Sequence, residues 1–405
     1  MNVPIIPYGG FLAIKSTGNQ AELAVKLSAN PNIQSLHLPD NGLFLAAWTQ
    51  FSGQGLWQSE TGAVAYDLDL TNTAELCTLV SLPIADVDQG ELIFALYRKY
   101  GNNFCDKLRG AFAFAIWDGS SRVLLVVTDF YGIRPVVTTQ RSGLFAAASR
   151  IRQLELVGIN KEINPEAIYH YLFFQAVCSP VSIYKDVRKL EPGKCIVVTG
   201  DKVNEQTWYD IVYKPVNGRS KEQWCQQISS EVEKAVGNFV ATKDEPETGC
   251  FLSGGTDSSS IAGYYTRLSP EPVKTFSIGF DDPKYNELDF ARVAVNRFGS
   301  AQHEYLVTPK DVLQLITDLP KIYDEPFGNA SVIAAYFCAK LARENNVAMM
   351  LGGDGGDEIF GGNERYVTNL VFQRYAELPE FFRKGLFEPL LGLLPSSGVF
   401  YKAKR

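Results

Sequence analysis

Two short glycine-rich segments, residues 251–259 and 351–358, combine residue types that bind phosphate with carboxylates that can bind a metal. Gly254 and Gly255 lack a Cβ, so backbone N–H groups there can turn toward a phosphate while neighbouring serines add hydroxyl donors. A carboxylate such as Asp257 would repel phosphate unless a cation lay between them, and Mg²⁺ commonly binds one or two carboxylates together with phosphate oxygens. The second segment adds Asp354, Asp357 and Glu358. The two segments together therefore predict a magnesium and phosphate site.

The common phosphate-binding and calcium-binding glycine motifs do not explain these segments. Neither Gly-x-x-x-x-Gly-Lys-Ser/Thr nor Gly-x-Gly-x-x-Gly occurs around Ser253. A strand-to-helix turn that uses Gly and Ser for steric reasons is the simpler alternative for the first segment. Residues 352–360 also satisfy the Gly-Gly-x-Gly-x-Asp repeat of calcium-binding β-rolls, but such rolls need several tandem copies and this chain has one.

Both segments are expected to follow strands of a parallel sheet. Beyond a Pro- and Gly-containing boundary near residues 213–220, apolar strands alternate with amphipathic helices. The expected strands are 248–252, 273–280, 302–307 and 347–351, and the expected helices are 221–241, 287–298 and 332–344. Ligands of open parallel sheets bind outside the carboxyl ends of the strands, where both glycine-rich segments begin.

The first part of the chain has a different pattern. Short β-rich runs alternate with turn residues, which predicts an antiparallel, sandwich-like domain. The expected strands are 43–49, 63–66, 111–117, 123–128 and 143–149, with helices at 91–100 and 165–174 and a turn and strand within 187–198. We therefore predict an α/β protein with two domains, residues 1–213 and 214–405. A length of 405 residues, which exceeds the usual size of a single core, agrees with that division.

The two glycine-rich segments together resemble the asparagine synthetase family, whose synthetase domain is an ATP pyrophosphatase with a Ser-Gly-Gly-x-Asp-Ser loop. Residues 274–280, 285–287 and 290–291 resemble the family's second strand and the helix after it, and residues 323–331 resemble its substrate-side Asp-Glu-Pro segment. Residues 96–118 and 129–135 resemble the body of its glutaminase domain, which has the fold of the N-terminal-nucleophile amidohydrolases. The resemblance covers most of the chain and implies ATP and Mg²⁺ as cofactors.

The family's motifs imply a role for particular residues of this chain. The phosphates of ATP and Mg²⁺ would bind at Ser253, Gly254, Gly255, Thr256, Asp257, Ser258 and Ser259. Asp257 and Asp357 would be the metal ligands and, with Glu325, the catalytic residues. Leu252, Ile278, Gly352 and Gly353 match positions that line the adenosine. Leu252 and Ile278 could equally be strand core. Glu325 would position the acceptor amine or the substrate carboxylate, with a helix-capping acid as its alternative.

The glutaminase chemistry of the family is not expected here. Those enzymes use an amino-terminal Cys whose own α-amine acts as base. This chain has Asn2 after Met1, and if residues 9–13 are matched to the family's first residues instead, the nucleophile position holds Gly9. The first cysteine is Cys77, and the glutamine-binding motifs have no clear counterpart. We expect a degenerate glutaminase-like domain, as in β-lactam synthetases and lasso-peptide cyclases, which the family resemblance also covers.

Composition excludes several classes of function. A net charge of −7 without a basic cluster argues against nucleic acid, and no apolar run approaches the length of a membrane span. The first residues lack the pattern of an export signal, and seven cysteines without a Cys-x-x-Cys pair suit reduced thiols. We therefore expect a cytoplasmic protein that binds neither nucleic acid nor membrane.

The expected reaction is the formation of an amide from a carboxylate and an amine. A small-molecule or peptide carboxylate is adenylated with release of pyrophosphate, and ammonia or an amine then displaces AMP. The alternatives are a cyclising synthetase of the β-lactam or lasso-peptide type, and an inactive nucleotide-binding scaffold. The family's synthetase domains continue past the point that corresponds to Arg405. We therefore expect this domain to be incomplete at its carboxyl end, with a second polypeptide as a partner that completes it.

Overall fold

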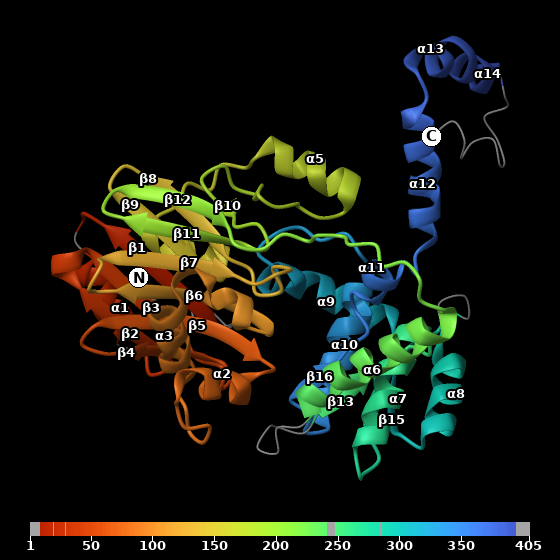
Figure 1. The fold of residues 1–405 in the computed structure, drawn as a ribbon, viewed down its shortest axis with the longest axis horizontal. Helices are drawn as coiled ribbons and strands as arrows, with labels where there is room; N and C mark the ends of the chain where they lie inside the picture. The colour runs from red at the N-terminus through yellow and green to blue at the C-terminus, as the bar shows by residue number, and fades with distance from the viewer. Residues whose placement is uncertain (1–8, 19, 29, 241–247, 283–285, 394–405) are drawn as a thin grey trace. The chain divides into compact units, whose positions relative to one another are not determined.

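A computed structural model of the chain describes residues 9–393 except 19, 29, 241–247 and 283–285 (Figure 1). These residues form two compact units. The first unit takes its residues from 1–243 and from 307–337, and the second takes its residues from 244–306 and from 338–405. Residues 307–337 thus belong with the amino-terminal unit although they follow the first glycine-rich segment in the chain. The predicted domain boundary at residue 213 comes from sequence motifs rather than from this division into units, and it stays a prediction.

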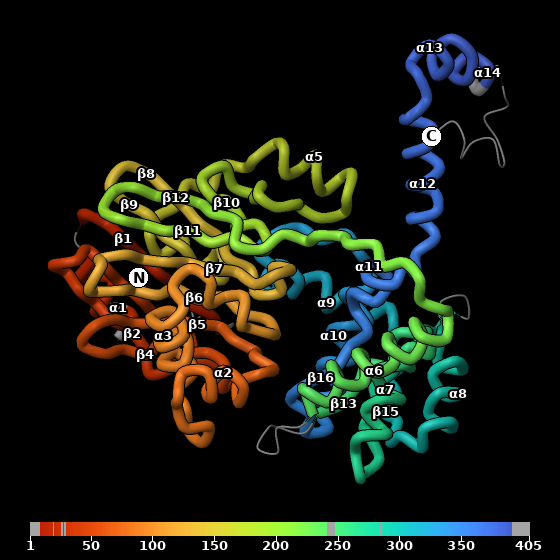
Figure 2. Tube along the Cα trace, in the orientation of Figure 1, coloured from red at the N-terminus to blue at the C-terminus, as the bar shows by residue number. Residues whose placement is uncertain are grey.

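Two antiparallel sheets, each of six strands within the described residues, form the centre of the first unit. The first sheet has the strand order β10-β8-β9-β1-β3-β2 and the second has the order β12-β11-β7-β6-β5-β4. Figure 2 allows the path through these strands to be followed. Their bounds are β1 Gly10–Ser16, β2 Ile33–Leu38, β3 Leu43–Trp48, β4 Gln54–Gln58, β5 Gly62–Leu70, β6 Gly110–Asp118, β7 Val123–Thr128, β8 Val137–Arg141, β9 Leu144–Ala148, β10 Arg188–Lys189, β11 Lys194–Thr199 and β12 Lys202–Thr207.

The sheets pack face to face because their strands are apolar on both sides. In β1, Phe11 and Ala13 face the second sheet, in one cluster with Ala115 and Val126. Alternate side chains of a strand point to opposite faces, so the residues between them, such as Leu12, lie in a different cluster on the outer face. A run of apolar residues without alternation therefore indicates a strand that is covered on both faces.

Helices cover the outer faces of both sheets. α1 (Ala21–Ser28), α4 (Ile151–Leu154) and α5 (Pro165–Phe174) contribute residues to the cluster on the first sheet. α2 (Thr73–Val80) and α3 (Gln89–Tyr100) contribute residues to the cluster on the second sheet. The unit therefore has four layers, helices outside and two sheets inside, and the predicted antiparallel sandwich is confirmed.

Among the residues that the structure describes, a four-stranded sheet of order β15-β14-β13-β16 forms the centre of the second unit. β13 (Thr248–Phe251) pairs in parallel with both β14 (Lys274–Phe280) and β16 (Met349–Leu351), and β15 (Ala301–Val307) lies beside β14. A small core of Phe276, Cys338, Ala342 and Val347 packs on this sheet. The predicted parallel α/β arrangement is confirmed.

The remaining helices include several at positions that the sequence predicts. α6 is Lys221–Val240, α8 is Leu288–Phe298 and α10 is Ser331–Glu344, each within a residue or two of its expected bounds. The others are α7 Thr256–Leu268, α9 Pro309–Ile322, α11 Gly356–Phe360, α12 Glu364–Glu377, α13 Glu380–Phe382 and α14 Glu388–Leu393. The predictions about Met1, Asn2, Tyr285 and the last residues to Arg405 lie outside the described residues.

Candidate functional site

The two glycine-rich segments leave the sheet from neighbouring strands. Cys250 in β13 is paired with Leu351 in β16, so the residues after each strand begin their loops beside each other. β13 also marks the place where the strand order reverses, because β14 lies on one side of it and the much later β16 on the other. Open parallel sheets bind ligands at such a point, beyond the carboxyl ends of the strands.

The first loop is held by its own serines and opens the 13-residue helix α7. The Ser253 amide donates to Ser258 Oγ (3.2 Å), the two serine hydroxyls lie 3.1 Å apart, and the Gly255 amide donates to Ser253 Oγ (3.3 Å). Gly255 stands at the amino-terminal end of α7, where no side chain caps the helix. Uncapped N–H groups at a helix start, together with hydroxyl donors, form a typical anion site.

Gly254 is required at its position for two reasons. Its φ of +85° lies in the left-handed region, which other residues rarely adopt. A Cβ there would also lie 2.4 Å from the carbonyl carbon of Phe290, at the start of α8. The backbone of the loop therefore packs directly against α8, which fixes the direction in which the loop leaves the strand.

The second loop approaches the first turn of α7 at Asp257. A Cβ added to Gly353 would lie 2.7 Å from Asp257 Cβ and 2.9 Å from the Ser258 nitrogen, so only glycine allows this approach. A Cβ added to Gly356 would lie 2.5 Å from Asp257 Oδ2. The Asp257 carboxylate therefore lies against the second loop, and the predicted meeting of the two loops is observed.

The carboxylates of the two loops suit a metal ion that takes most of its ligands from water and phosphate. Within the described ranges, no group of three or more His, Cys, Asp or Glu side chains gathers in a way that would hold an ion by itself. Mg²⁺ typically keeps several waters and binds one or two carboxylates plus phosphate oxygens, so the donors at this site fit it in combination with ATP. Asp257 lies between the loops and Asp357 in the short helix α11 that follows the second loop. The assignment of both as ligands stays a prediction.

The predicted adenosine positions have structural roles in addition. Leu252 is only 2% exposed, its amide donates to the Phe276 carbonyl (2.9 Å), and its own carbonyl accepts from Ser277 Oγ (2.7 Å). Ile278 packs against the core cluster of the second unit. Both residues therefore fix the edge of the site through packing and backbone contacts. Gly352 and Gly353 lie in the second loop, and contact of these four positions with adenosine remains a prediction.

Glu325 lies in the first unit and its carboxylate already has partners. Glu325 Oε2 accepts from Lys189 Nζ (2.6 Å), and Oε1 accepts from the Ile183 amide (2.8 Å). The neighbouring Asp324 accepts from the Ile151 amide (2.9 Å), and burial raises the pKa of its carboxyl although the charge of Arg150 opposes the shift. The sequence resemblance did not indicate these contacts, because Lys189 and Ile183 carry no motif.

In the register that matches residues 9–13 to the family's first residues, the space beside the predicted nucleophile position is filled. A Cβ added to Gly9 would lie 1.7 Å from Gln54 Oε1. Gln54 is 7% exposed, and its Oε1 accepts from the Gln50 amide (3.1 Å). The adjacent Gly10 has a φ of +123° and lies against the Ser149 side chain, so this backbone also leaves no room for a larger residue. The sequence register that begins at Met1 lies outside the described residues.

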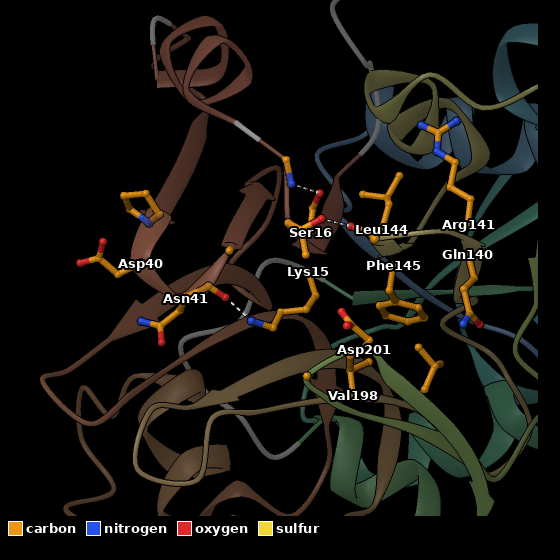
Figure 3. A pocket seen from close by; sticks show the side chains of 17 residues that line it. Lys15, Ser16, Asp40, Asn41, Gln140, Arg141, Leu144, Phe145, Val198 and Asp201 are labelled. Carbon is orange, nitrogen blue, oxygen red and sulfur yellow. Dashed lines mark hydrogen bonds between the residues drawn. The ribbon is translucent and has the colours of Figure 1, made fainter.

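Two cavities are lined only by residues of the first unit. One of about 540 Å³ is bordered by α9 and by residues 323–327. The other, of about 360 Å³, lies at the end of the sandwich where β1 finishes (Figure 3). There the Lys15 ammonium donates to the Asn41 carbonyl and lies 5.2 Å from the centre of the Trp117 ring, and burial lowers its pKa. No sequence motif points to this second cavity.

The fold defines a protein of two units, a four-layered sandwich with two antiparallel sheets and a parallel α/β unit in which two glycine-rich loops meet beyond neighbouring strands. Residues 84–209 match the family model described as glutamine amidotransferase domain, and residues 227–399 match the model described as asparagine synthase. The chain belongs to the asparagine synthetase family.

Individual proteins are similar at moderate identity. Asparagine synthetase [glutamine-hydrolyzing] 1 of Bacillus subtilis (strain 168) is 32% identical over 300 residues, which are 73% of this chain and 46% of that protein. Amidase chyE of Penicillium rubens is 26% identical over 300 residues, which are 69% of this chain and 44% of that protein. The chain thus spans about half the length of the curated relatives it matches.

A solved structure of glutamine phosphoribosylpyrophosphate amidotransferase from B. subtilis, complexed with ADP and GMP, is a distant structural neighbour. It is similar at a TM-score of 0.36 and 11% identity, with 85% of this chain and 90% of that chain covered. Among the described residues, no helix is at once long and apolar enough to cross a membrane.

Proposed function

We propose that this protein is an ATP-dependent amide ligase that adenylates a carboxylate and lets an amine or ammonia displace AMP. The observation that supports this proposal best is the close approach of Gly353 and Gly356 to Asp257. It joins a serine-rich helix start, suited to phosphate, to a second loop that carries further carboxylates. The second loop needs glycine at both positions where it meets Asp257.

Each group of the proposed site has a chemical task. The N–H groups at the start of α7 and the hydroxyls of Ser253 and Ser258 would bind the β- and γ-phosphates. Asp257 and Asp357 would hold Mg²⁺, which when bound neutralises charge on the departing pyrophosphate. A substrate carboxylate oxygen attacks the α-phosphorus, the bond from that phosphorus to the bridging oxygen breaks, and pyrophosphate leaves. The amine then attacks the acyl carbon, AMP departs with the bonding electrons, and a proton is released from the amine nitrogen.

The amine is proposed to come from solution or from the substrate rather than from glutamine hydrolysis. Gly9 has no nucleophilic side chain, and Gln54 occupies the space where one would lie. This feature also favours the second candidate, a cyclising synthetase in which an amine of the substrate itself attacks the acyl adenylate. Incubation of the purified protein with glutamine should release no ammonia above a protein-free blank. Release that persists through a second purification would contradict this part of the proposal.

Calorimetry with Mg-ATP tests the site directly. Asp257→Asn keeps the shape of the side chain but removes the negative charge, so Mg-ATP should bind about tenfold or more weakly while ATP in EDTA is affected less. Asp289→Asn is the matched control, because Asp289 is a strongly exposed residue of the same unit whose partner is Arg292 on α8. Equal Mg-ATP affinity in the wild type and Asp257→Asn would refute the metal assignment.

A further inference from the structure

Glu325 belongs to a segment that resembles the family's substrate side, yet its carboxylate is bound inside the first unit. Lys189 Nζ donates to Oε2 (2.6 Å) and the Ile183 amide donates to Oε1 (2.8 Å). Lys189 also donates to the carbonyl of Val177. Each oxygen of Glu325 therefore accepts a hydrogen bond from the amidotransferase-like sandwich or its connecting loops.

Both members of this ion pair are largely shielded from solvent, unlike those of an exposed pair in the same unit. The side chains of Lys189 and Glu325 are 16% and 17% exposed, whereas those of Lys185 and Glu162 are 48% and 57% exposed. An exposed ion pair contributes little because water and salt screen it, but removal of one member of a buried pair leaves the other charge without compensation. The Lys189 and Glu325 pair therefore holds its two segments together.

The residues around Glu325 are attached to the same sandwich. Asp324 accepts from the Ile151 amide at the start of α4 (2.9 Å), and its other oxygen lies 3.6 Å from Arg152 Nε. Arg150 donates to the Ile322 carbonyl (3.1 Å). Three positions, 322, 324 and 325, are thus held from α4 and from the segment before β11.

We propose that Glu325 is a positioning residue and that the amidotransferase-like unit serves to hold the substrate-side segment through it. The contacts of Asp324 and Glu325 with Ile151, Arg152, Ile183 and Lys189 are called the clamp below. The inference rests on the proposed function, because only an amide ligase of this type would have a substrate beside residues 323–331. It gives the sandwich a task that does not depend on glutamine hydrolysis.

The clamp also fixes the wall of a cavity. Residues 323–327 border the cavity of about 540 Å³, and the rings of Tyr323 and Phe327 stack there at 5.7 Å and 17°. These rings flank Asp324 and Glu325 in the chain, so the clamp holds the backbone from which both rings project. Release of the clamp should therefore loosen the segment and leave the nucleotide loops, which lie in the other unit, intact.

Variants of the pair provide the test. Glu325→Gln keeps an oxygen for the Ile183 amide but loses the charge, Lys189→Met loses the other charge, and the double variant loses both. Lys189→Arg restores a cation, and Glu162→Gln is a control that removes an exposed pair. Hydrogen exchange of the amides in residues 320–330 is measured on the full chain, together with the Kd for Mg-ATP. Pyrophosphate release is measured with aspartate and ammonium chloride as probes.

The proposal predicts a specific pattern. Glu325→Gln and Lys189→Met each accelerate exchange in residues 320–330 about tenfold or more, and the double variant is no faster than the faster single variant. Lys189→Arg and Glu162→Gln exchange like the wild type. Where turnover is measurable, the KM for aspartate rises about tenfold with little change in kcat or in the Kd for Mg-ATP, because only a fraction of the molecules hold the segment correctly.

Two results would overturn the proposal. Unchanged exchange in Glu325→Gln with a large loss of kcat would make Glu325 catalytic. Additive effects of the two single variants would show that Lys189 and Glu325 act independently. If the wild type neither binds Mg-ATP nor releases pyrophosphate, the proposed function fails, while the exchange measurements still decide whether the clamp exists.

Discussion

Replacement of Gly353 by alanine tests whether the close approach of the two loops forms the nucleotide site. The added Cβ would lie 2.7 Å from Asp257 Cβ, 2.8 Å from the Asp257 carbonyl carbon and 2.9 Å from the Ser258 nitrogen. Two of these three atoms belong to the backbone of α7, so no rotation of a side chain relieves the conflict. The loops must instead move apart by about 0.7 Å to reach ordinary contact distance.

The size of the effect follows from the cost of overpacking. Insertion of a methyl group into such a contact costs about 1–3 kcal/mol, which the protein can avoid by letting the second loop move away from α7. If the full overpacking cost must be overcome to form the loop arrangement that binds Mg-ATP, the Kd for Mg-ATP rises about 5- to 150-fold. Both loops lie beyond the carboxyl ends of their strands and outside the core, so the fold itself should change little.

Calorimetric titration with Mg-ATP measures the change, and thermal unfolding checks that the variant is folded. Gly385→Ala is the matched control, because nothing lies within 4 Å of a Cβ at that glycine of the same unit and its φ is ordinary. The control should bind Mg-ATP like the wild type. A folded Gly353→Ala protein with wild-type affinity would show that the approach of the loops has no part in binding the nucleotide.

Two further predictions concern burial and helix capping. Burial raises the pKa of Cys250 and of Cys338 to about 12, so both thiols stay protonated at pH 8. Iodoacetamide should therefore label the exposed Cys225 long before these two cysteines. Equal labelling rates of the three cysteines in the folded protein, measured by mass spectrometry, would contradict this prediction. Thr308 and Asp311 form a reciprocal cap at the start of α9. The Thr308→Ala variant should therefore lose about 1 kcal/mol of unfolding free energy, and its midpoint of thermal unfolding in scanning calorimetry should fall by about 2–4 °C. An unchanged midpoint would mean that the cap contributes nothing to stability.

Local sequence patterns predict much of this fold because the relevant interactions are local. Asn164 before Pro165 marks the start of α5, and the apolar run 123–128 coincides with β7. The parallel sheet and the positions of both loops follow from alternation of strands and helices. α9 was not anticipated, although Thr308, Pro309 and Asp311 form a recognisable start signal.

Other features depend on contacts between distant parts of the chain, which a single sequence does not show. Nothing in the composition around Gly9 indicates that Gln54 fills the space beside it. Likewise, the Asp-Glu-Pro motif suggests a role for Glu325 but not its partner Lys189, which is 136 residues earlier in the chain. β1 was not predicted, although its apolar run is buried on both faces like that of β7.

The division of the units along the chain has a consequence for how such a protein can be taken apart. Because residues 307–337 belong with the amino-terminal unit, the carboxyl-terminal unit is made of two separate stretches, 244–306 and 338–405. No single cut in the chain separates the units, and neither unit can be replaced by exchanging one continuous stretch of sequence. Deletion of residues 1–243 would therefore leave residues 307–337 in place but without the partners that bind Asp324 and Glu325.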